Sequence, residues 1–516
     1  MSASIKSTPS INSTSDSESQ KKTRRILRKL DAHLLPSFAF LWLANFIDRS
    51  NIGNARIAGL EHDTKLIGNQ FNVVLVVFYV AYLSVELPSN VLLQKLKPNR
   101  WIPMTVIAWG TVTTLTSLVQ NFKGVIVVRI FLGLCEGGIL PSMMVYLSTL
   151  YKREELQFRV AIFYTAASLA GAFGGLLATG IQKMDGIGGL AGWRWIFILE
   201  GLATIIAGIA VAFILPESLA KAHFLTEEER IFAVRRYHMD DVTLNSPASP
   251  ELGTPEEKVD KEIRVGNLDL AGAIHRERVE DFEWREIIRG FADPQSWLLG
   301  FSYCGLLVGL NSYSLFLPTI ISGLGYSGPQ AQLHTVPPYV PAAILTLIIA
   351  FLADRLKLRG PFVLMVLPLA MIGYIIAICA KANSTRYVAV FFMAAGVYPS
   401  GPCFLAILAN NTSGRYKKAT SIAIQIAIAN SAGFIAPFAY TPDQAPKYIR
   451  GHIISLAFVC FTWTLVACNV VYCWWENKAR ADGRRQSNID KYNALFDSRK
   501  TKAPIGDRHP DFKFVL

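Results

Sequence analysis

RIFLGLCEGGILPSMMVY, residues 129–146, places two charged side chains, Arg129 and Glu136, inside a run apolar enough to cross a bilayer. A second apolar run, FLWLANFIDRSN, carries Asp48 and Arg49. A charge at the bilayer centre costs at least about 2.5 kcal/mol, so such residues persist where they pair, line a cavity or bind cargo. These four residues therefore predict a polar pathway through a membrane protein.

The composition agrees with a polytopic membrane protein. The chain has 516 residues, 52% of them hydrophobic, and a mean hydropathy of +0.33, which exceeds what a soluble core needs. The net charge of +13 does not predict a nucleic-acid partner, because the basic residues cluster between apolar segments rather than in one patch with aromatic residues.

A window of about 20 residues, the length that crosses about 30 Å of hydrocarbon, predicts twelve membrane helices in two groups of six. The expected helices span roughly residues 34–54, 71–94, 101–119, 124–147, 160–181, 194–215, 296–321, 333–353, 361–380, 386–410, 419–440 and 452–475. The fold class is therefore an all-α integral membrane protein of two pseudo-symmetric bundles, divided as tail 1–32, bundle 33–215, central loop 216–295, bundle 296–475 and tail 476–516.

Lys and Arg residues concentrate in alternate loops, beginning with KKTRRILRK before the first helix. Cytoplasmic loops retain positive charge, so both termini and the central loop are predicted to be cytoplasmic. Within that loop, LTEEERIFAVRRYHMDD is a candidate amphipathic helix, which we expect to be a solvated connector. We expect both terminal tails to be disordered.

The depths of the four charged residues are similar enough for contact. At about 1.5 Å per residue, Asp48 lies about 21 Å from the cytoplasmic edge and Arg129 about 8 Å from the outer edge, so an ion pair between them is allowed. Glu136 follows Arg129 by two helical turns on nearly the same face, about 10 Å deeper. Arg49 could direct its donors at an anionic ligand.

Two plainer interpretations stay open. The first helix could end near Phe46, which would leave Asp48 and Arg49 in an interfacial turn, and Arg129 could extend to the outer surface. Other polar residues at mid-membrane depth could line a cavity or cement helix packing; they are Tyr82, Glu86, Asn311, Tyr313, Ser314, Tyr339, Gln425 and Asn430.

Glycine and proline predict local features of two helices. Gly171, Gly174 and Gly175 in the fifth helix favour close helix approach, and Pro399 with Pro402 indicates a broken or bent tenth helix.

Several segments resemble the anion:cation symporter family of the major facilitator superfamily, and among its members the fungal allantoate permease subfamily, which includes nicotinate and other vitamin transporters. The segments are FIDRSNIGNA, ELPSNVLLQKLKPNRW, RIFLGLCEGGILPSMMVY, GWRWIFILEG, LPTIISGLGYSGPQAQLHTVPPY and YTPDQAPKYIRGH. The resemblance runs from about residue 30 to 480.

The resemblance implies proton-coupled uptake of a small organic anion by rocking of the two bundles around a central site. By position, it assigns proton coupling to Asp48, Glu136 and Arg129. It assigns substrate binding to Arg49, Tyr82 and Asn430, and the cavity-facing residues Asn311 and Tyr313 join that predicted set. No cofactor is expected beyond the coupling protons.

Other functional classes have less support in the sequence. An enzyme would need a catalytic motif, and the chain has no HExxH motif or Cys/His cluster. Efflux of a secondary metabolite or drug-like compound stays an alternative, as does a non-transporting nutrient receptor on the same fold. We expect a monomer in contact with membrane lipid, most simply in the plasma membrane, that takes a small organic anion such as allantoate or nicotinate.

Overall fold

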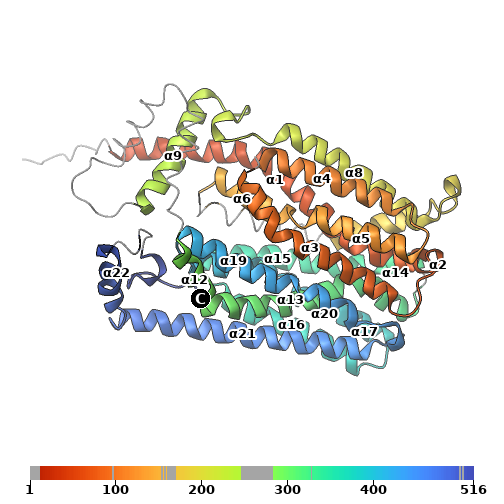
Figure 1. Ribbon diagram of the computed structural model, residues 1–516. Coiled ribbons are helices and arrows are strands. Elements are labelled where there is room, and N and C mark those ends of the chain that lie inside the picture. Colours follow the sequence, from red (N-terminus) through yellow and green to blue (C-terminus); the bar gives the residue numbers. More distant parts are fainter. Residues whose placement is uncertain are drawn as a thin grey trace, which may run out of the picture.

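The computed structural model describes residues 12–95, 98–152, 155, 159, 170–171, 173–245, 283–326, 328–498, 501 and 505–516. Within these ranges every regular element is a helix. Eight of the described helices are long and apolar enough to cross a membrane. In Figure 1 they run side by side, with the N-terminal half of the chain packed on the C-terminal half.

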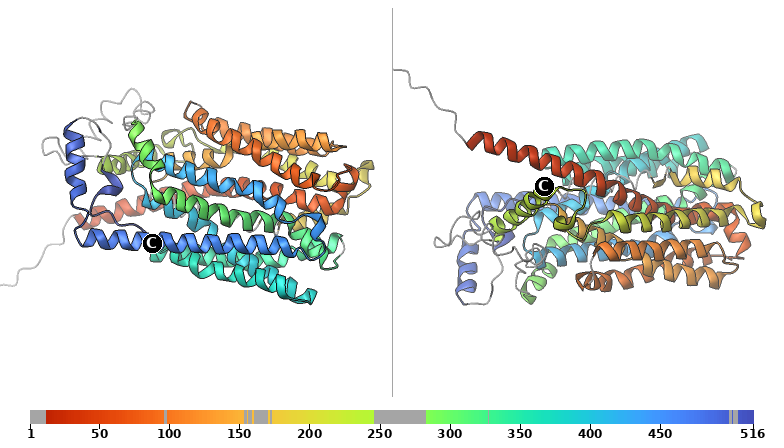
Figure 2. Two further views of the ribbon diagram at one scale, coloured as in Figure 1. Left: turned by 60° about the horizontal axis from the view of Figure 1, so that its bottom comes forward. Right: turned by 90° about the horizontal axis from the view of Figure 1, so that it is seen from above.

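The N-terminal half provides the first six spans. Its main helices are α1 (Asn12–Ala55), α3 (Gln70–Lys95), α4 (Pro98–Thr116), α5 (Phe122–Glu136), α6 (Ile139–Leu150) and α8 (Gly192–Ile214). Half of the predicted fifth helix lies outside the described ranges, and residues 173–182 are helical. In the view from above in Figure 2, the N-terminal part of α1 extends past the end of the bundle. Residues 12–32 are therefore helical, and the expectation of a disordered tail was wrong for them.

The C-terminal half provides the other six spans. Its main helices are α13 (Pro294–Gly323), α15 (Val336–Leu356), α16 (Gly360–Cys379), α17 (Asn383–Val397), α18 (Ser400–Asn411), α19 (Arg415–Asn430), α20 (Ala432–Ala439) and α21 (Ile449–Ala481). The tenth span is broken between α17 and α18 next to Pro399, which confirms that prediction. The eleventh, predicted as one helix, breaks at Ser431.

The fourth span is also two helices, whereas the sequence predicted one. Helix α5 ends at Glu136 and α6 begins at Ile139. Gly137 lies in this break, and a Cβ atom there would be 2.5 Å from the carbonyl oxygen of Tyr82 on α3. Glycine at this position therefore permits a close approach of α5 to α3, and that approach fixes the position of the neighbouring Glu136.

The two halves meet at the ends of the spans that the charge distribution assigns to the outer side. A buried apolar cluster there contains Ile52 and Phe71 from the N-terminal half and Phe316 and Tyr440 from the C-terminal half. Asn72 donates a hydrogen bond to the carbonyl of Pro437 across the boundary. These contacts close the outer side of the molecule.

The glycines of the fifth span also lie at the boundary between the halves. A Cβ atom on Gly171 would be 2.1 Å from the ring of Tyr339, and one on Gly175 would be 2.3 Å from the hydroxyl of Thr335. These two positions confirm the predicted close helix approach, and the partner is helix α15 with the residue before it.

The central-loop segment forms a helix, α9 (Glu227–Asn245), but it is not a free connector. Ala233 and Val234 are buried in the core cluster of the N-terminal half. Lys29 of α1 donates hydrogen bonds to Glu229 at 2.6 and 2.9 Å, and these bonds hold the pKa of the Glu229 carboxyl below its usual value. The expectation of a solvated loop was therefore wrong for this part.

The C-terminal tail is ordered where the structure describes it, contrary to our expectation. Helix α22 spans Ser487–Asp497, and the chain after it returns to the C-terminal half. Arg480 donates hydrogen bonds of 2.9 Å to three backbone carbonyls of that returning segment. Asn411 and Asn477 each exchange a pair of hydrogen bonds with its backbone. Side chains from α18 and α21 thus satisfy the backbone groups that a disordered tail would leave to water.

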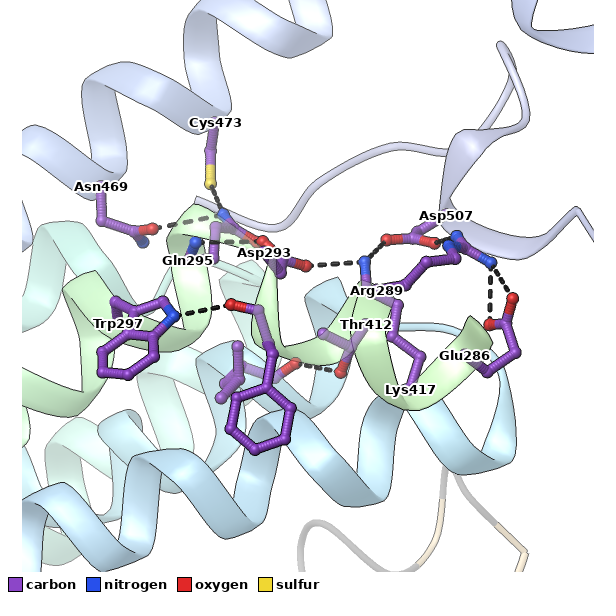
Figure 3. Close-up of polar contacts among 12 residues, drawn as sticks. Glu286, Arg289, Asp293, Gln295, Trp297, Thr412, Lys417, Asn469, Cys473 and Asp507 are labelled. Carbon is purple, nitrogen blue, oxygen red and sulfur yellow. Dashed lines mark hydrogen bonds and ion pairs between the residues drawn. The ribbon is translucent and has the colours of Figure 1, made fainter. Parts of the chain in front are cut away.

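An ion-pair network anchors this tail at the cytoplasmic end (Figure 3). Lys417 of α19 pairs with Asp507 of the tail and, at 2.6 Å, with Asp293. Arg289 of α12 (Trp284–Phe291) pairs with Asp507 at 3.0 Å and with Glu286 at 2.6 Å. The network joins three segments far apart in the chain, so we expect it to contribute to stability.

Lys417→Met is expected to destabilise the protein by about 3 kcal/mol or more, because removing one partner of a buried pair leaves uncompensated charge. Both Asp293 and Asp507 would lose their ammonium partner. The measurement is the midpoint of thermal unfolding in detergent. Lys221→Met is the matched control, since Lys221 is exposed in its pair with Glu217 and should matter little. Equal midpoints for the two variants would contradict the assignment.

Candidate functional site

The first span carries its polar residues through the membrane on one continuous helix. Helix α1 runs without interruption to Ala55, so it does not end near Phe46. Asp48 is 1% exposed. The interpretation of Asp48 and Arg49 as an interfacial turn is therefore wrong.

Arg49 and Glu136 form a buried ion pair between the first and fourth spans. The Nε atom of Arg49 donates to Oε1 of Glu136 at 2.9 Å, and Asn45, one turn earlier on α1, donates to the same oxygen. The Glu136 side chain is fully buried, whereas that of Arg49 keeps 20% of its surface exposed. The second Glu136 oxygen, Oε2, is buried without a hydrogen-bond partner in the described part of the chain.

Two aromatic rings of helix α3 lie against the guanidinium of Arg49. Its carbon Cζ lies 4.8 Å from the ring centre of Tyr82 and 5.6 Å from that of Phe78. Aromatic faces attract a guanidinium by cation–π interaction, and their rigid rings limit the directions that its donors can take. Tyr82 thus lies beside Arg49, and a role of either residue in binding stays a prediction.

Asp48 is bound by the third span rather than by an arginine. Its Oδ2 accepts a hydrogen bond from Nε1 of Trp109 at 2.7 Å and one from Thr113 at 3.4 Å, both on α4. Arg129 interacts with Asp48 electrostatically, yet its Nε and Nη2 atoms are buried and, among the described residues, have no hydrogen-bond partner. The allowed Asp48–Arg129 ion pair is thus not closed in this state, although Oδ1 of Asp48 is buried and, among the described residues, has no hydrogen-bond partner.

Arg129 does not reach the outer surface. It is 3% exposed, and the charged groups around it are Asp48, Glu136 and Glu200. The alternative in which Arg129 extends to the surface is therefore wrong. A guanidinium with free donors among three carboxylates can stabilise whichever of them is ionised.

Glu200 is the site residue that we did not predict. It lies on α8, and its Oε2 accepts a hydrogen bond of 2.6 Å from Asn51 of α1. The segment GWRWIFILEG places this acid well inside an apolar run. The rule that selected Asp48, an acid within a membrane span, would have selected Glu200 too.

The predicted residues of the C-terminal half are divided in the structure. Asn430 donates a hydrogen bond of 3.0 Å to Glu86 of α3 and so joins the two halves. Tyr313 instead packs among buried tyrosines of its own half, Tyr339 and Tyr398, and donates to the carbonyl of Val390 at 3.3 Å. In the described part of the chain, no hydrogen bond or ring contact joins Tyr313 to Arg49. Asn311, half-buried on α13, likewise has no such contact.

Comparison with known proteins agrees with this architecture. The family model described as Major Facilitator Superfamily matches residues 38–467. An uncharacterized transporter of Schizosaccharomyces pombe is 35% identical and covers 98% of this chain and 93% of its own length. The high-affinity nicotinic acid transporter of Saccharomyces cerevisiae is 30% identical, with coverage of 97% and 86%.

A solved structure supports the fold at lower sequence similarity. A bacterial homolog of the human lysosomal transporter Spinster, in an inward-facing and unoccupied conformation, aligns with a TM-score of 0.59 at 15% identity, covering 84% of this chain and 95% of that one. The two relatives are named as transporters, not enzymes, and the one from Saccharomyces cerevisiae is named for a small molecule, nicotinic acid. This chain, a multi-pass membrane protein, belongs to the major facilitator superfamily.

Proposed function

We propose that the protein takes up a small organic anion together with protons. The observation that carries the proposal is the Arg49–Glu136 pair. In it, the most accessible guanidinium of the site is neutralised by a fully buried carboxylate. The resemblance to the allantoate permease subfamily and the relative named for nicotinic acid, a carboxylic acid, support the same class of cargo.

Competition for Arg49 would couple the proton to the anion. While Glu136 is ionised, it occupies the Arg49 donor, and a buried carboxylate without its partner would be costly. A proton on Glu136 removes its negative charge and releases Arg49, whose planar donors suit a carboxylate. Proton binding and anion binding therefore favour each other, and this linkage is reciprocal.

The direction of transport follows from the driving forces. An anion that enters with one proton carries no net charge, so the pH gradient alone drives it. A second proton adds about 2.3 kcal/mol per 100 mV of inward negative potential. In the plasma membrane of a cell in acidic surroundings, both arrangements favour uptake. Asp48 would be the second proton site, and Arg129 would be the cation that stabilises its ionised form.

The test is uptake at low external pH by cells that lack their own carriers, with labelled nicotinate, allantoate and short carboxylates. Nicotinamide, which lacks the carboxylate of nicotinate, is the matched control. We expect at least one acid to accumulate more at low than at neutral external pH, and the amide not to accumulate. Export of the acids would instead indicate an efflux carrier, and binding without flux a receptor; either result would contradict the proposal.

Arg49→Ala is expected to weaken binding of the transported acid. Hydrogen bonds to charged groups contribute about 1.5–3 kcal/mol, so affinity should fall roughly 10- to 150-fold. The measurement is competition by unlabelled acid in the uptake assay. Arg450→Ala is the control, since Arg450 is an exposed residue paired with Asp443. An unchanged affinity in Arg49→Ala would remove Arg49 from the binding site.

A further inference from the structure

The mechanism above does not use Glu200, a half-buried acid of the N-terminal half. Glu200 lies on α8 and is hydrogen-bonded through Oε2 to Asn51 at 2.6 Å. Its Oε1 atom is buried, and the described residues offer it no hydrogen-bond donor. A buried carboxylate with a bare oxygen is costly when ionised, whereas a protonated carboxyl could hold its hydrogen on that oxygen.

The surroundings of Glu200 contain more negative than positive groups. The charged groups that interact with it are Asp48 from α1 and Arg129 and Glu136 from α5. Helix α4, which packs on α8, presents Gly110 and Thr114 at the adjoining turn. The π-helical turn after α1, Arg56–Leu60, presents Arg56, which is paired with Glu61.

Charge balance in the cluster requires at least one proton. Three carboxylates, Asp48, Glu136 and Glu200, surround two guanidiniums, Arg49 and Arg129. With all five ionised, these residues carry one net negative charge, and Glu86 of α3, which interacts with Arg49, is a further acid outside this count. Because Arg49 is paired with Glu136, the excess falls on Asp48 and Glu200, which have Arg129 as their common cation.

Glu200 also lies on the outer side of Asp48. Its donor Asn51 is one turn beyond Asp48 along the outward course of α1, about 4.5 Å further out. Asn54, another turn on, donates to Asn51 at 3.0 Å, and its own carbonyl accepts a hydrogen bond from Gln332 of the C-terminal half at 3.4 Å. A buried polar ladder therefore runs from the outer contact between the halves to Glu200.

We propose that Glu200 is a third proton-binding residue, which shares one proton with Asp48 beside Arg129 and exchanges it with the outer side. In the transfer, the proton leaves the Glu200 carboxyl group and joins the Asp48 carboxylate, and no other group changes charge. The inference rests on proton-coupled transport as proposed above. It gives the site an outer station for the proton that is separate from the Glu136 station beside the substrate.

The test is infrared difference spectroscopy of the full chain in lipid nanodiscs between acidic and alkaline pH, which needs no substrate. Buried protonated carboxyl groups give a carbonyl stretching band. We expect Glu200→Gln, which keeps an oxygen that can accept from Asn51, to lose one component of that band. Glu227→Gln, an exposed change on α9, should leave the spectrum of the wild type. An unchanged band in Glu200→Gln would overturn the inference.

Two further variants keep the test decisive. Glu200→Asp retains an acid and should restore a component, and Asn51→Leu should shift the Glu200 component by removing its hydrogen-bond donor while leaving it in the spectrum. If Glu200→Gln does not fold, the absence of any shift in Asn51→Leu would overturn the inference. Proton-driven uptake by the wild type tests the proposed function separately. Uptake with an unchanged Glu200→Gln band would reject the inference alone, whereas no uptake of any acid would reject the function.

Discussion

Glu136→Gln is expected to abolish accumulation of the transported acid while leaving its exchange across the membrane. Glutamine keeps the shape of the side chain and cannot carry a proton, so Arg49 would be permanently free for the anion. Each coupled proton in a gradient of one pH unit supplies about 1.4 kcal/mol, which is about tenfold accumulation. Without proton coupling, the pH gradient should no longer raise the ratio of internal to external acid above about one.

The measurement is paired uptake and counterflow in liposomes with an imposed pH gradient. Counterflow needs binding and the conformational change but no net proton movement, so the two assays separate coupling from binding. Glu61→Gln is the matched control, because Glu61 pairs with Arg56 near the outer end and not with the buried cluster. Concentrative uptake at the wild-type level in Glu136→Gln would exclude Glu136 from coupling.

Gly53→Val is expected to prevent the outer side from closing and so to abolish both uptake and counterflow. A Cβ atom on Gly53 would lie 2.3 Å from the carbonyl oxygen of Leu315 on α13, which is backbone and cannot rotate away. Overpacking costs about 1–3 kcal/mol, and a bias of that size changes a conformational population by about 5- to 150-fold. The outward-open state should then dominate.

The conformational effect can be measured by labelling a cysteine introduced at Asn72 from the outer side. Asn72 is fully buried at the closed contact, so it should react slowly in the wild-type background and quickly together with Gly53→Val. Gly180→Val is the matched control, since nothing lies within 4 Å of a Cβ atom there. Normal transport in Gly53→Val would show that the Gly53 contact is not part of the cycle.

Much of the architecture could be predicted from hydropathy, because an apolar run of sufficient length must satisfy its backbone as a helix in lipid. The same reasoning found Asp48 and Glu136, because a charged residue in such a run is costly unless it pairs, lines a cavity or binds a ligand. It could not place the break after Glu136. That break depends on how closely α5 approaches the carbonyl of Tyr82, a contact between helices that no single segment encodes.

The pairing within the site was the least predictable part. Depth along each helix allowed Asp48 to meet Arg129, but the rotation of the helices brought Arg49 to Glu136 and Trp109 to Asp48 instead. Depth fixes one coordinate of a side chain, whereas pairing depends on three. Polar surface helices were misjudged for a related reason: α9 is charged overall, yet Ala233 and Val234 suffice to bury one side of it.

The most direct test of proton-coupled anion uptake through the Arg49–Glu136 pair is a simultaneous record of proton and substrate entry. Liposomes with a trapped pH dye and wild-type protein would receive the acid that the uptake panel identifies, with no preset pH gradient. The account predicts that the liposome interior acidifies as the acid enters down its own concentration gradient. It also predicts that Glu136→Gln admits the acid without acidification. Equal acidification in both proteins, or entry of the acid into wild-type liposomes with no proton movement, would contradict it.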